Sequence, residues 1–91
     1  MTVSKENKEF LVGLIEYYVS EAQSYREMAQ EYSLKIDSVP DTAFGIIVGC
    51  IYSSFLQTYS NQKLTPTVQD VQEFTEIIMM KSNAIMDAIK K

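Results

Sequence analysis

Between Leu11 and Tyr32, apolar residues recur at alternating intervals of four and three residues. This spacing holds one stripe of a helix against a partner helix, as in a coiled coil. The opposite stripe, from Glu9 to Gln30, holds only polar residues and one glycine. A helix over residues 4–33 would be about 45 Å long, which is the length of a small bundle. The apolar stripe consists of Leu11, Ile15, Tyr18, Ala22, Tyr25, Ala29 and Tyr32.

Two prolines divide the rest of the chain, and each stands where a helix can begin. Ser38 and Asp41, which flank Pro40, have the spacing of a capping box, in which each side chain bonds the backbone N–H of the other residue. This signal predicts a second helix over residues 39–60.

The second proline predicts a third helix over residues 66–90. Thr65 offers a capping hydroxyl, and Pro66 would occupy the first helical position, where its missing N–H costs nothing. Thr67 and Asp70 offer an alternative start two residues later. No segment combines strand alternation with turn residues. We therefore expect residues 1–91 to form a single all-α domain of three long antiparallel helices, joined by short links.

The middle segment has no charged residue from Thr42 to Gln62, which is typical of a helix packed between other helices. Its small residues Gly45, Gly49 and Ser53 share one side of the helix, where we expect another helix to pack closely. Two alternatives are an open groove for an apolar ligand and close helix pairing in a membrane.

A membrane span is not expected from this segment. Only Ala43 to Tyr52 is continuously apolar, about half of the ~20 residues that a span requires. The acidic residues near the N-terminus and the lack of a small-residue cleavage site do not fit a signal peptide. The single cysteine, Cys50, fits a reducing compartment, so we expect a cytoplasmic protein.

The composition excludes several classes of function. The chain has no histidine, which excludes Ser-His-Asp and Cys-His catalysis and zinc sites built on imidazole. Its 12 acidic and 8 basic residues give a net charge of −4, which argues against a nucleic-acid partner. We expect no cofactor.

Carboxylates are the remaining candidates for chemistry. Asp70, Glu73 and Glu76 step by three along one helix and, with a carboxylate from another helix, would suit Mg²⁺ or Ca²⁺. The alternative, which the sequence favours, is that they are acids in the first turns of a helix, stabilised by its dipole. Glu16 lies in an apolar region but belongs to the polar stripe, so we expect it to face water.

Apolar residues outside the predicted core indicate self-association. A chain of this size buries only about 60 to 68% of its unfolded surface, which leaves a monomer marginally stable. The first and third segments carry more apolar residues than two neighbouring helices can cover. We expect a two-fold homodimer that completes a larger bundle. Its predicted interface consists of Phe10, Leu14, Tyr17, Val19, Met79 and Met86.

These features favour a non-enzymatic helical interaction or assembly module that associates with itself and docks a partner protein. One alternative is a helical-bundle phosphohydrolase that depends on a divalent cation and uses Asp70, Glu73 and Glu76. Another is a bundle that carries an apolar ligand in a cavity beside Gly45 and Gly49.

Overall fold

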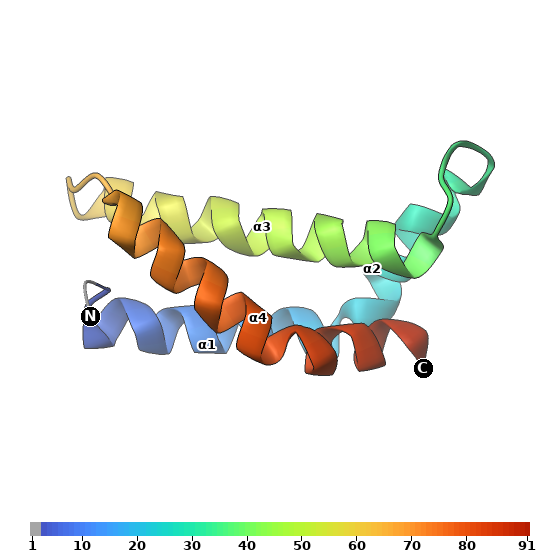
Figure 1. Ribbon diagram of the computed structural model, residues 1–91, viewed down its shortest axis with the longest axis horizontal. Helices are drawn as coiled ribbons and strands as arrows, with labels where there is room; N and C mark the ends of the chain where they lie inside the picture. The colour runs from blue at the N-terminus through green and yellow to red at the C-terminus, as the bar shows by residue number, and fades with distance from the viewer. Residues whose placement is uncertain (1–2) are drawn as a thin grey trace.

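The computed structural model describes residues 3–91, which fold as a small all-α domain without a β-strand (Figure 1). The all-α prediction is therefore confirmed for this part of the chain. Four α-helices are present where three were expected. The elements are α1 (Lys5–Ser20), α2 (Ala22–Gln30), the 3-10 turn η1 (Ser33–Lys35), α3 (Val39–Asn61) and α4 (Val68–Lys90).

The single helix predicted over residues 4–33 is wrong, because it is interrupted at Glu21. The Ser20 hydroxyl donates to the carbonyl of Tyr17 at 2.6 Å, and the Glu21 N–H is shared between the carbonyls of Tyr17 and Tyr18. A serine hydroxyl that bonds the preceding turn commonly bends a helix. As a result α2 leaves the line of α1 (Figure 1). The helix α2 ends at Gln30, and Tyr32, which follows it, is exposed.

The predicted start of α3 is confirmed. The Ser38 Oγ accepts a hydrogen bond from the Asp41 N–H at 3.2 Å, which caps the helix that begins at Val39. Pro40 lies in the first turn, where a proline is tolerated.

The predicted start of α4 at residue 66 is wrong by two residues. The helix begins at Val68, and its cap is the alternative Thr67–Asp70 box. The Asp70 N–H donates to Thr67 Oγ1 at 3.1 Å, while Asp70 Oδ2 accepts from the Thr67 N–H at 2.8 Å. Two reciprocal bonds satisfy more backbone groups than one hydroxyl at Thr65 would.

The core runs along one face of α3, which packs against all three other α-helices. Ring contacts join its C-terminal half to α4, with Phe55 and Phe74 centroids 4.9 Å apart and Tyr52 and Phe74 centroids 5.0 Å apart. In Figure 1, α4 begins beside the end of α3 and crosses obliquely toward α2. The fully buried large side chains are Leu11, Ile47, Ile51, Phe55, Ile85 and Ile89.

The far end of α4 is tied to α2 by polar bonds. Gln23 Nε2 donates to the carbonyl of Ala88 at 2.8 Å, and Arg26 Nη1 donates to the carbonyls of Ile89 and Lys91 at 3.2 and 3.1 Å. These carbonyls have no hydrogen-bond partner within the helix. The positive charge of Arg26 also interacts favourably with the negative end of the helix dipole.

The small residues of α3 do not pack against another helix of this chain. Gly45, Gly49 and Ser53 lie on the exposed side of α3, and no neighbouring atom of the described residues lies within 4 Å of a Cβ placed at either glycine. The larger residues opposite them bury more apolar area and so occupy the interior. A close helix contact at this face requires a second molecule and stays a prediction.

Among residues 3–91, α3 is the only helix long and apolar enough, by length and composition, to cross a membrane, and 22% of its most apolar window is buried inside the structure.

Replacing Gly49 by Ala is expected to raise the free energy of unfolding by about 0.5–1 kcal/mol, because alanine is the better helix former and meets no neighbour there. Urea unfolding measures the change. The matched control is Gly13→Ala in α1, which is equally open and should be stabilised to a similar degree. Destabilisation by Gly49→Ala alone would show that this face of α3 is packed.

Candidate interaction surface

One side of α4 carries no charge. Three of its residues, Val68, Thr75 and Met79, are exposed, and three others, Val71, Ser82 and Met86, are half-buried. We call this side the α4 stripe, and its most exposed apolar residues are Val68, 76% exposed, and Met79, 67% exposed. The side chain of Met86 packs partly against the core and closes the stripe toward the C-terminus. The α4 stripe consists of Val68, Val71, Thr75, Met79, Ser82 and Met86.

Both hydroxyl groups of the α4 stripe are satisfied by their own helix. Thr75 Oγ1 donates to the carbonyl of Val71 at 3.1 Å, and Ser82 Oγ donates to the carbonyl of Met79 at 2.8 Å. The methyl group of Thr75 is then available for packing. The stripe therefore presents an apolar surface with little unmet hydrogen-bonding demand.

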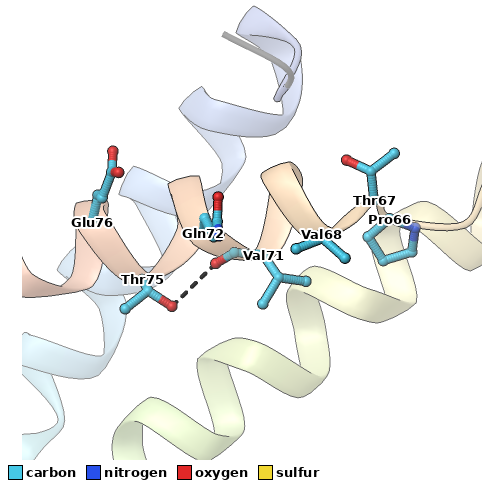
Figure 2. A pocket seen from close by; sticks show the side chains of 7 residues that line it. All are labelled: Pro66, Thr67, Val68, Val71, Gln72, Thr75 and Glu76. Carbon is cyan, nitrogen blue, oxygen red and sulfur yellow. Dashed lines mark hydrogen bonds between the residues drawn. The ribbon is translucent and has the colours of Figure 1, made fainter.

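The N-terminal half of the stripe borders an open hollow of about 740 Å³. Figure 2 shows Val71 and Thr75 pointing to one side of α4, while Gln72 and Glu76 point to the other. All the residues that line this hollow belong to α4 or to the two residues before it. The hollow is thus a feature of the unpartnered helix face.

The other predicted interface residues lie on α1. Phe10 and Tyr17 are 47% and 55% exposed, whereas Leu14 and Val19 are half-buried against the core. Phe10 lines a separate shallow hollow with Thr58. The α1 residues and the N-terminal half of the α4 stripe thus border different hollows, and their place in an interface stays a prediction.

The three predicted carboxylates do not converge on a common point. Asp70 is buried in the capping box of α4, and Glu76 is exposed. Glu73 Oε1 accepts from the backbone N–H of Val3 at 3.2 Å, and its Oε2 lies 3.1 Å from the ammonium group of Lys8. No group of three or more His, Cys, Asp or Glu residues among residues 3–91 is arranged to hold a metal ion.

Two further candidates lie at the surface. Glu16 is exposed, as its place in the polar stripe predicts. Gly45 and Gly49 lie on the outer side of α3 and do not border an enclosed space. The described residues therefore form no cavity for an apolar ligand beside these glycines.

A partly buried polar cluster joins the start of α1 to the end of α3. The amides of Asn7 and Gln62 exchange two hydrogen bonds, of 3.1 and 2.8 Å. The nearby Tyr59 hydroxyl has no partner of good geometry among the described residues, although Asn7 lies next to it. Burial raises the pKa of Tyr59, and the negative charge of Asp70 raises it further. Both hydrogen bonds join the same two residues, so this cluster ties the start of α1 to the C-terminal end of α3.

No known protein family, no curated protein and no solved structure matches this chain. The candidate site therefore depends on the geometry of the chain itself.

Sequence reasoning found Met79 and Met86 but missed the rest of the α4 stripe. Val71 shares the helical spacing of Phe74 and Ile78, which predicts a core position, yet it is only half-buried. Val68 was not singled out. The signal that was available is the uncharged series at intervals of three and four residues, the spacing that marks a helix seam.

Tyr59→Phe is expected to change the free energy of unfolding at neutral pH by less than about 1 kcal/mol, because no well-formed hydrogen bond is lost. The raised pKa predicts a different result in alkali. Above the ordinary tyrosine pKa of 10.0 the unfolded chain ionises first, so wild-type stability falls as pH rises toward the folded-state pKa.

The variant should lose less stability than wild type between pH 7 and about pH 10.5, as measured by urea unfolding at both values. Part of the loss of stability in alkali should persist in the Tyr59→Phe variant, because burial also raises the pKa of Tyr18. Tyr32→Phe, at an exposed tyrosine, is measured alongside as the control for the loss of one phenol group. Equal slopes for Tyr59→Phe and wild type would contradict the burial of this hydroxyl.

Proposed function

We propose that this chain is a non-enzymatic helical assembly module that associates with a second copy through the α4 stripe. The observation that carries the proposal is the stripe itself, an uncharged row of side chains along one side of α4 in which Val68, Thr75 and Met79 are exposed. Scattered apolar residues are common on protein surfaces, but a contiguous apolar row along a helix is typical of an interaction surface.

The energetics favour covering this row. Fully burying a valine or methionine side chain contributes about 1.5–3 kcal/mol, and the two most exposed stripe residues, Val68 and Met79, have most of that gain still unrealised. Both polar members of the stripe already bond their own helix, so their burial leaves no hydroxyl donor without a partner.

The contacts that the acidic residues make also support an assembly role rather than a metal-dependent enzyme. Asp70 caps its own helix, and Glu73 is engaged by Lys8 and by the backbone of Val3. These contacts account for two of the three carboxylates as parts of the fold.

Sedimentation velocity over a range of micromolar concentrations tests the proposal. We expect wild type to sediment as a dimer, and Met79→Glu to weaken association by roughly tenfold or more, because a charge would be placed in an apolar contact. Met80→Glu is the matched control, since Met80 is 80% exposed but lies off the stripe, in the hollow between α1 and α4.

Circular dichroism should show equal helix content in both variants, since both substituted side chains are exposed. A wild-type chain that sediments as a monomer throughout this range contradicts the proposed function. Equal weakening by Met79→Glu and Met80→Glu contradicts the assignment of the surface to the α4 stripe.

A further inference from the structure

We infer that residues 3–8 form a clasp, which opens without unfolding the rest of the chain and which Glu73 of α4 holds closed. The clasp consists of Val3, the capping residue Ser4 and the first turn of α1. This inference goes beyond the proposed function, because it concerns α1 and applies within a single copy of the chain.

The clasp has a single apolar anchor. Val3 is 3% exposed and belongs to the core cluster, although it precedes the first helix. Among residues 3–10 the only other buried side chain is that of Asn7, which is polar. The next apolar anchors of α1 are Leu11 and Ile15, both of which are buried. Because apolar burial is the main stabilising contribution to folding, the clasp is stabilised less by it than the rest of α1 is.

Polar bonds also connect the clasp to its neighbours. Glu73 bonds it at both ends, since its Oε1 accepts from the Val3 N–H at 3.2 Å and its Oε2 lies 3.1 Å from the Lys8 ammonium group. In the middle of the clasp, Asn7 exchanges two hydrogen bonds with Gln62, which follows α3. One side chain of α4 thus contacts both ends of the segment.

The ion pair between Lys8 and Glu73 is sheltered from solvent. Their side chains are 29% and 14% exposed, so water screens their attraction less than it screens a pair on an open surface. Loss of the Glu73 charge should therefore weaken the closed clasp more than the loss of an exposed charge would.

Open space lies on both sides of the clasp. Lys8 and Glu73 line a hollow of about 520 Å³ between α1 and α4. Asn7 and Gln62 line a second hollow, of about 280 Å³, between α1 and α3. When the clasp opens, these two hollows join into one groove between α3 and α4. The buried hydroxyl of Tyr59 then gains access to water, because Asn7 lies next to it.

Native-state hydrogen exchange of the full chain, resolved by residue, tests the clasp. The amides from Asn7 to Leu11 report its opening, because their hydrogen bonds lead back to residues 4–7. We expect Glu73→Gln to accelerate their exchange by roughly fivefold or more, while the amides of Ile47 and Ile51 in α3 keep their rates. Glutamine retains an oxygen that can accept from Val3 but loses the charge that attracts Lys8.

Two further variants separate the clasp from general stability. Lys8→Gln removes the same ion pair from the other side, so it should give the same pattern, and it also serves if Glu73→Gln does not fold. Glu76→Gln is the matched control, because Glu76 is an exposed glutamate one turn further along α4. It should leave the rates from Asn7 to Leu11 unchanged.

Two results would overturn the clasp. Equal acceleration in α1 and α3 would show that Glu73 stabilises the fold as a whole. Unchanged rates in both Glu73→Gln and Lys8→Gln would show that the ion pair does not hold the segment closed. Neither result bears on self-association, which sedimentation tests separately.

Discussion

The contact between Phe55 and Phe74 is the interaction on which the rest of the structure depends. Their ring centroids lie 4.9 Å apart, in the range where aromatic pairs attract beyond their buried area. Phe55 is fully buried on α3, and Tyr52 adds a second ring contact to Phe74. This junction fixes which side of α4 faces the core. The side that carries Val68 and Met79 is consequently turned outward.

The two ends of α4 hold this orientation in place. At its start, the reciprocal Thr67–Asp70 cap stabilises the first turn of the helix. The ion pair between Glu73 and Lys8 joins this end of the helix to α1. At its end, Arg26 of α2 donates to the last carbonyls. A helix held at both ends and at its middle has little freedom to rotate, so its uncharged stripe cannot turn inward. Association with a second copy, as proposed, would cover it.

Much of the fold could be predicted from the sequence, because helix periodicity and capping residues act locally. The start of α3 follows from Ser38, and the burial of Leu11 and Ile15 follows from their spacing. The break at Glu21 could not be predicted, since it depends on a competition between the Ser20 hydroxyl and ordinary helical bonds. The α4 stripe was only partly visible, because the spacing that includes Val71 fits both a core and a seam.

The methionine methyl groups provide the most direct measurement of the central claim, which is that the α4 stripe is the surface through which copies meet. In NMR spectra of methyl-labelled methionine, dilution of the protein should shift the resonances of Met79 and Met86, which lie on the stripe. Those of Met80 and Met28, which lie off it, should stay fixed. Shifts confined to Met80 or Met28, or spectra that do not change with concentration, would contradict the account.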